Sequence, residues 1–199
     1  GTSALHASLL ANDIGNSDEV LVPSFSFIST ANAALFVNSK PVFVDIEEET
    51  FGMDPKLIEQ NISSKTKAII PMDYGGQSCK IFDIKEKAHE NNLVLIEDAA
   101  ESLGSFTSGV HTGRIGQTGI LSFNGNKIIT TGGGGALITD DKEVARRAKH
   151  LTTTAKQPHP WLFLHDEVGY NYRLPNINAA LGCGQMDKLS RYVKQKRKL

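Results

Sequence analysis

A lysine and a run of four glycines lie close together in SFNGNKIITTGGGGALIT, residues 122–139. Lys127 follows Ser122 by five residues and precedes Gly132 by five. Four successive glycines lose much conformational entropy on ordering, so a fold keeps them where the backbone passes close to another group or turns with positive φ. The pattern indicates a ligand near Lys127.

Three kinds of site compete for Lys127 and the glycines. A dinucleotide fingerprint needs its glycines between a strand and a helix, whereas a strand-like ALIT follows them here. A Walker phosphate loop needs G-x-x-x-x-G-K-[ST], which this stretch lacks. The third makes Lys127 the covalent anchor of an aldehyde cofactor, because a lysine amine is a nucleophile and glycines leave room for a flat ring. Considered alone, Lys127 also fits an exposed loop lysine.

Pyridoxal phosphate chemistry needs such a lysine, an acid beside the pyridine nitrogen and a phosphate cradle. Asp98 ends the apolar run LVLIED, at the strand edge where ligands of open α/β sheets bind. A buried carboxylate there needs a cation, although Asp98 also fits a cap of the next segment. Thr2 and Ser3 open a helical pattern whose free N–H groups attract phosphate, and Ser122 adds a hydroxyl. As helix caps alone, Thr2 and Ser3 are ordinary.

Composition narrows the class of protein. A chain of 199 residues is long enough for one ordinary α/β domain, and 40% hydrophobic with 22% charged residues is typical of globular proteins in general. The net charge of −1 argues against broad nucleic-acid binding, and no apolar run is long enough for a membrane helix. Cys79 and Cys183 lack zinc-ligand spacing. We therefore expect a cytoplasmic protein with reduced thiols and no metal.

Short β-rich runs alternate with helical patterns, which predicts a parallel sheet with helices on both faces. The predicted strands span 19–23, 41–46, 67–72, 93–98, 119–123 and 136–139, and helical patterns begin at Ser3, Ser29, Asp54, Ile81 and Asp141. Asp54 is a predicted N-cap with a proline in the first turn. Residues 152–174 break the rhythm as a long loop, and the pattern is helical again from Pro175. Both ends look cut from a longer protein.

Seven segments in order resemble the DegT-type nucleotide-sugar aminotransferases, pyridoxal-phosphate enzymes of fold type I. They are GTSALHASLL, EVLVPSFSFISTANA, KPVFVDI, LVLIEDAAESLGS, SFNGNK, TTGGGGALIT and GYNYRLPNINAALG. The resemblance covers nearly the whole chain. It implies one cofactor-binding large domain over 1–199, with a mostly parallel seven-stranded-type sheet. The family's N-terminal arm and small C-terminal domain are expected to be missing.

The resemblance also implies roles for the residues at the predicted cofactor site. Lys127 carries the cofactor, Asp98 pairs with its pyridine nitrogen, and Thr2, Ser3 and Ser122 hold its phosphate. Some relatives have histidine at the position of Lys127 and catalyse dehydration. The lysine found here therefore argues for transamination.

Three further residues receive roles from the resemblance. Phe27 covers a cofactor face, although a core phenylalanine after a strand is the alternative. Glu101 lies near the cofactor's phenolic oxygen, where a carboxylate would repel a phenolate. Asn171 reaches the phosphate of a neighbouring subunit's cofactor, which implies a homodimer with shared active sites.

The long loop at 152–174 is expected at that dimer interface. Its residues His159, Trp161 and His165 would face the partner or the sugar nucleotide, or serve only in surface packing. The stretch PMDYGGQS, residues 71–78, departs from the family's histidine-containing pattern.

The implied reaction moves an amino group from an amino-acid donor to a keto group of a nucleotide-linked deoxysugar. The resemblance implies glutamate as the donor. The segments are most similar to the branch that aminates C4 of UDP-linked sugars for bacterial surface polysaccharides. The alternative is a truncated, non-catalytic remnant that binds cofactor or a partner. The basic tail KLSRYVKQKRKL fits the solvated face of a helix better than a nucleic-acid site.

Overall fold

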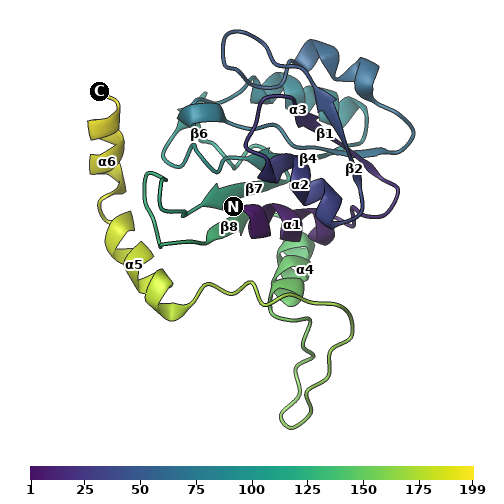
Figure 1. Ribbon diagram of the computed structural model, residues 1–199, viewed down its shortest axis with the longest axis vertical. Coiled ribbons are helices and arrows are strands. Elements are labelled where there is room, and N and C mark those ends of the chain that lie inside the picture. The colour runs from purple at the N-terminus through teal and green to yellow at the C-terminus, as the bar shows by residue number, and fades with distance from the viewer.

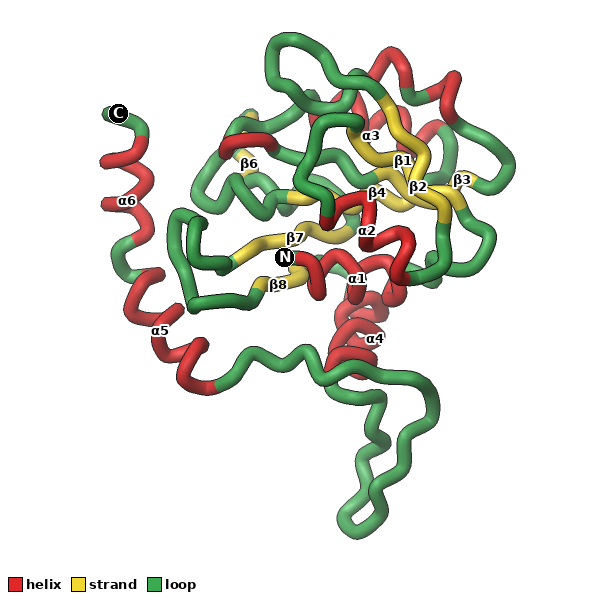
Figure 2. Tube along the Cα trace, in the orientation of Figure 1, coloured by secondary structure: helices red, strands yellow, loops and turns green.

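The structure is a computed structural model that describes residues 1–199 (Figure 1). Its helices are α1 (Thr2–Ala11), α2 (Ser29–Phe36), α3 (Ile81–Glu90), α4 (Lys142–Thr152), α5 (Asn176–Met186) and α6 (Leu189–Lys196). Its strands are β1 (Glu19–Pro23), β2 (Lys40–Val44), β3 (Thr66–Ile69), β4 (Val94–Asp98), β5 (Phe106–Thr107), β6 (Val110–His111), β7 (Thr118–Ser122) and β8 (Gly135–Ile138). Figure 2 shows that the strands gather at the centre of the molecule, with helices around them.

The central sheet has six strands in the order β2-β1-β3-β4-β7-β8. The first five are parallel, and β8 runs antiparallel to β7. The mostly parallel α/β fold is therefore confirmed. The expected seven strands are not, because only six runs of the chain pair in this sheet. The 48 residues from Thr152 to Leu199 add no strand to it.

Two apolar cores lie on the two faces of the sheet, because successive side chains of a strand point to opposite sides. Val20 and Val22 of β1 pack in one core with Leu5 and Leu9 of α1 and with apolar residues of α2. Leu21 points to the other core, with side chains of α3 and with Leu57 and Ile58 at the end of the 3₁₀ turn η1 (Pro55–Leu57); the next turn, η2 (Glu59–Asn61), buries no residue. Helices on both faces are thus confirmed.

Some local predictions were only partly right. Residues 54–61 form the two short 3₁₀ turns rather than one α-helix, although Asp54 does cap the first by accepting the N–H of Lys56 at 2.9 Å. The hairpin β5–β6 was not predicted, because strands of two residues leave no periodicity to read. The predicted helix after Pro175 divides into α5 and α6 at Asp187 and Lys188.

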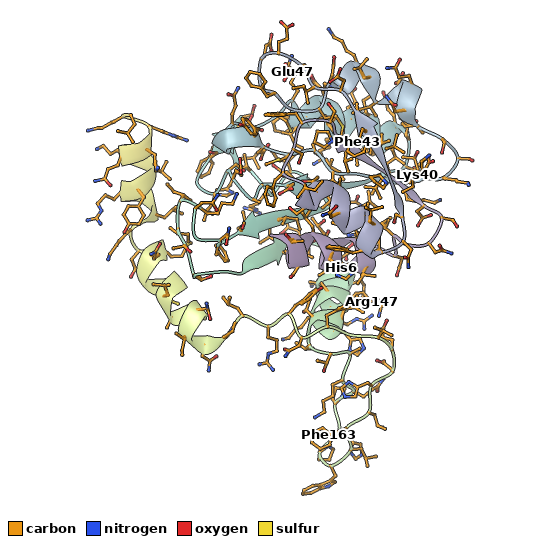
Figure 3. The ribbon with its side chains drawn as sticks, in the orientation of Figure 1. His6, Lys40, Phe43, Glu47, Arg147 and Phe163 are labelled. Atoms are coloured by element: carbon orange, nitrogen blue, oxygen red, sulfur yellow. The ribbon has the colours of Figure 1, made fainter.

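The molecule has two contrasting regions: residues 1–151, here called the sheet body, and residues 152–199, the outer segment. The outer segment first runs away from the sheet body as a narrow loop with Phe163 near its tip, then returns to α5 and α6 (Figures 1 and 3). Ala155 is its one buried hydrophobic residue.

Ion pairs fix the base of this loop to α4. Both guanidinium N–H groups of Arg147 reach the Glu167 carboxylate, and His150 Nε2 lies 2.7 Å from Asp166 Oδ1. None of the chain's helices combines the length and the apolarity needed to cross a bilayer.

Candidate active site

One cavity of about 1120 Å³ lies at the carboxyl ends of β4 and β7. All eight predicted site residues line it: Thr2, Ser3, Phe27, Asp98, Glu101, Ser122, Lys127 and Asn171. They come from five separate segments of the chain. The structure thus brings them together, whereas their roles remain predictions.

Asp98 ends β4 and is buried. Its Oδ2 accepts the Thr30 hydroxyl at 2.8 Å, and its Oδ1 accepts the N–H of Ala100 at 3.3 Å. Burial, the largest influence, raises the pKa of the Asp98 carboxyl, and these two hydrogen bonds oppose the rise. The hydrogen bond from the Ala100 N–H is a local cap of the segment after β4, which is the alternative role that the sequence allowed for Asp98. Asp98 also faces the cavity, so the two interpretations coexist.

Lys127 lies in the connection between β7 and β8. Its backbone N–H donates to Asn124 O at 3.1 Å, and its Nζ donates to Glu101 Oε1 at 3.0 Å. The side chain is 16% exposed, which excludes a freely solvated loop lysine. Glu101 Oε2 accepts the N–H of Gly75 at 3.0 Å. Glu101 therefore holds the lysine ammonium while its own position is fixed by backbone.

The N-terminus of α1 meets Ser122 and the glycine run. The Gly1 nitrogen lies 3.1 Å from Gly134 O and 3.4 Å from Ser122 Oγ. A Cβ on Gly135 would lie only 2.7 Å from the Gly1 nitrogen, so a side chain at Gly135 would push α1 away. The glycine run thus leaves room for the N-terminus of α1, and it also lines the cavity. The first N–H groups of α1 have no intrahelical partner and suit an anion.

Phe27 is 63% exposed and lines the cavity, which excludes the alternative of a core phenylalanine. Asn171 lines the cavity of its own chain, and its predicted reach to a neighbouring subunit stays a prediction. His159, Trp161 and His165 are exposed on the outer segment and do not line the cavity.

The unusual 71–78 stretch forms part of the cavity's support. Met72 lines the cavity, and Asp73 lies fully buried behind it. Asp73 Oδ1 accepts the N–H of Cys79 at 3.1 Å, and its Oδ2 accepts the Ser102 hydroxyl at 2.9 Å. This stretch is therefore tied to the loop that carries Glu101.

The sequence interpretation missed Thr30, which bonds Asp98 directly. Thr30 is buried in α2, and Ser26 donates to its hydroxyl at 2.8 Å. The available signal was the Thr30 hydroxyl in the pattern STANAALF, which also contains the polar residues Ser29 and Asn32. It was read only as part of a helix, because a periodic pattern does not say which strand end a helix faces.

The residues present fit pyridoxal phosphate. Asp98 is a buried carboxylate with no cationic side chain within ion-pair distance, and a pyridinium would supply the missing positive charge. The amine of Lys127 lies in the same cavity, and the N-terminus of α1 with the Ser122 hydroxyl offers donors for a phosphate. Fold and cavity together define a pyridoxal-phosphate-binding α/β domain.

The chain belongs to the DegT/DnrJ/EryC1/StrS aminotransferase family, which matches residues 1–199. The GDP-perosamine synthase of Escherichia coli O157:H7 is 41% identical over 199 residues, which are 100% of this chain and 54% of that protein. A putative pyridoxal phosphate-dependent aminotransferase of Bacillus subtilis, EpsN, is 38% identical over 203 residues, 99% of this chain and 52% of that protein.

The fold agrees with the family. The crystal structure of the aminotransferase TlmJ from Streptoalloteichus hindustanus superposes with a TM-score of 0.94 at 31% identity, over 99% of this chain and 54% of that one. The chain spans about half the length of the curated relatives it matches. The cofactor of the family is pyridoxal 5′-phosphate.

Proposed function

We propose that this chain is the cofactor-binding domain of an aminotransferase that transfers an amino group from an amino acid to a keto group of a nucleotide-linked deoxysugar. One observation carries the proposal. Lys127, Asp98 and the N-terminus of α1 line one cavity, which brings together the three kinds of group that pyridoxal phosphate needs. Residues 1–199 then form one domain.

Each residue has a role in this proposal. Thr2, Ser3 and Ser122 bind the phosphate, and the Asp98 carboxylate holds a proton on the pyridine nitrogen, with Thr30 keeping that carboxylate in place. Bound in this way, the cofactor supplies an electron sink for the carbanion formed at the donor's α-carbon.

Lys127 is the general base and acid. Its Nζ takes the proton from the donor's α-carbon and later returns a proton to the carbon that accepts the amine. Glu101 lies 3.0 Å from Nζ and stabilises the ammonium that forms. Phe27, which lines the cavity, covers one face of the cofactor in this proposal.

The substrate assignment goes beyond family membership. The sequence pattern favours a C4 keto group of a UDP-linked sugar in surface-polysaccharide synthesis, with glutamate as donor. Relatives named GDP-perosamine synthase support a sugar substrate and make GDP the second nucleotide to test. Free Cys79 and Cys183 are compatible with a reducing compartment such as the cytoplasm.

We further propose a homodimer, with residues 152–174 at its interface and Asn171 reaching the partner's cofactor. Support comes from the exposed apolar side chains of this loop: Trp161 is 83% exposed and Phe163 is 78% exposed. A monomer rarely leaves such side chains together in water.

The second candidate is a binding remnant without turnover. The groups that line the cavity would support cofactor binding by themselves, whether or not turnover follows. Absorbance spectroscopy separates the two candidates. The loaded protein should change its cofactor spectrum on addition of glutamate, and should then aminate a UDP- or GDP-linked 4-keto sugar, with the product identified by mass spectrometry. Cofactor binding without any glutamate-dependent change would favour the remnant.

A further inference from the structure

A second hollow, of about 1100 Å³, opens on the other side of the Lys127–Glu101 ion pair. It shares Glu101, Asn126 and Lys127 with the first cavity. The proposed reactive amine therefore stands between two hollows. The groups proposed to bind the cofactor, namely Asp98, Ser122 and the α1 N-terminus, line only the first one.

The wall of the second hollow consists of α6 on one side and two loops of the sheet body on the other. Figure 1 shows α6 standing beside the sheet body, with the C-terminus at its end. Gly104, with a φ of +88°, lets α6 pack directly on its loop, since a Cβ there would lie 2.8 Å from Val193 Cγ2. The Ser105 hydroxyl donates to Gly76 O at 2.6 Å and ties the two loops together. The wall is thus held by specific contacts.

Cations dominate this wall. Lys196, Arg197 and Lys198 line the hollow, whereas Glu101 is its one acidic residue. Glu101 is already neutralised by Lys127 and by the N–H of Gly75. The hollow therefore carries an uncompensated positive charge, and lysine and arginine are the side chains that bind phosphate groups.

We propose that this second hollow binds the diphosphate of the nucleotide-linked substrate, with the sugar's keto carbon at Lys127. The inference rests on the proposed function. The volume is at the upper end of that of small-molecule sites, and an amino-acid donor would leave most of it empty. The three cations and Lys127 line the same hollow, and an elongated anion bound there would contact both.

Two lysine pairs on the same segment test the proposal. In the double variant Lys196→Ala/Lys198→Ala, both altered residues line the hollow; in the control Lys188→Ala/Lys194→Ala, neither does. All four side chains are exposed, and both doubles remove the same charge. Calorimetric titration of the cofactor-loaded protein with UDP and GDP, and with uridine and guanosine as probes without phosphate, measures binding directly.

We expect the 196/198 variant to weaken UDP or GDP binding at least about tenfold, and more at low salt, while the control changes little. The KM for the nucleotide sugar should rise by a similar factor, with the rate of the glutamate half-reaction unchanged. Equal losses in both variants, or no loss in the 196/198 variant, would overturn the proposal.

A slower glutamate half-reaction in the 196/198 variant would also overturn it, because the hollow would then hold the donor's carboxylates. The titrations need no turnover. If the unaltered protein fails to react with glutamate, the proposed function is lost while the binding result still decides this inference.

Discussion

The sheet body and the outer segment differ in how many apolar side chains they bury and in which residues they supply to the two hollows. The sheet body buries two apolar cores and supplies seven of the eight predicted site residues. The outer segment buries one hydrophobic side chain and supplies Asn171 and the basic wall of the second hollow. In the proposed function, the sheet body therefore supplies the catalytic groups, whereas the outer segment supplies substrate binding and assembly. Changes in the two regions should therefore have separable effects.

The largest effect is expected for Asp98→Asn in the sheet body. Asparagine keeps the shape and the bond from Thr30 but loses the charge that holds a proton on the pyridine nitrogen. The glutamate half-reaction should slow about 100-fold or more, measured by stopped-flow absorbance. The free energy of unfolding without cofactor should not fall, since a buried, uncompensated carboxylate is removed.

A drop in stability together with unchanged kinetics would contradict this account of Asp98. The dimer content, measured by sedimentation, serves as the internal control, because Asp98 lies in the sheet body and should not affect assembly.

A tenfold effect is expected for Thr30→Val. The variant removes the hydroxyl that donates to Asp98 at 2.8 Å and keeps the side-chain volume, so the half-reaction should slow about tenfold. Thr118→Val is the matched control: its hydroxyl is buried too but bonds Ser8 at 2.6 Å, away from the cavity. Equal slowing by both would mean that Thr30 acts only through stability.

The outer segment is tested with Trp161→Ser/Phe163→Ser. If this loop forms the homodimer interface, the dimer should dissociate at concentrations about tenfold or more above those of the unaltered protein. The sheet body should keep its unfolding free energy within about 0.5 kcal/mol, because both side chains are exposed. Val144→Ser on α4 is the control. An unchanged dimer would remove these two residues from the interface.

A pH effect on stability is also expected in the sheet body. Burial first, then nearby Glu97, raises the pKa of Asp73 to about 7. A carboxyl whose pKa is raised by folding stabilises the protein fully below its unfolded pKa and loses this contribution as pH rises. The unfolding free energy should therefore fall by a few kcal/mol, in order of magnitude, between about pH 4 and pH 7.

Urea denaturation at several pH values measures this fall. Asp73→Asn should flatten the pH profile, and Asp83→Asn, an exposed control on α3, should leave it unchanged. A profile that keeps its slope in Asp73→Asn would assign the effect to another buried acid whose pKa is raised, such as Asp98.

Much of the sheet body could be predicted from the sequence, because apolar runs such as 93–98 and 119–123 differ clearly from the helical patterns between them. The convergence of Asp98 and Lys127 followed from both lying near carboxyl ends of strands. Thr30 could not be predicted, because its partner lies 68 residues away and helical periodicity does not specify it. The second hollow was also missed, since it depends on how α6 packs on Gly104.

The central claim is that the amine of Lys127 carries the cofactor. Borohydride converts a reversible lysine–aldehyde linkage into a stable amine, so reduction of the loaded protein followed by peptide mass spectrometry identifies the attached residue. The account predicts a pyridoxyl phosphate group on the peptide with Lys127, lost in Lys127→Ala and retained in Lys149→Ala, whose lysine also lines the first cavity. Attachment at Lys149 or another lysine, or no attachment at all, would contradict it.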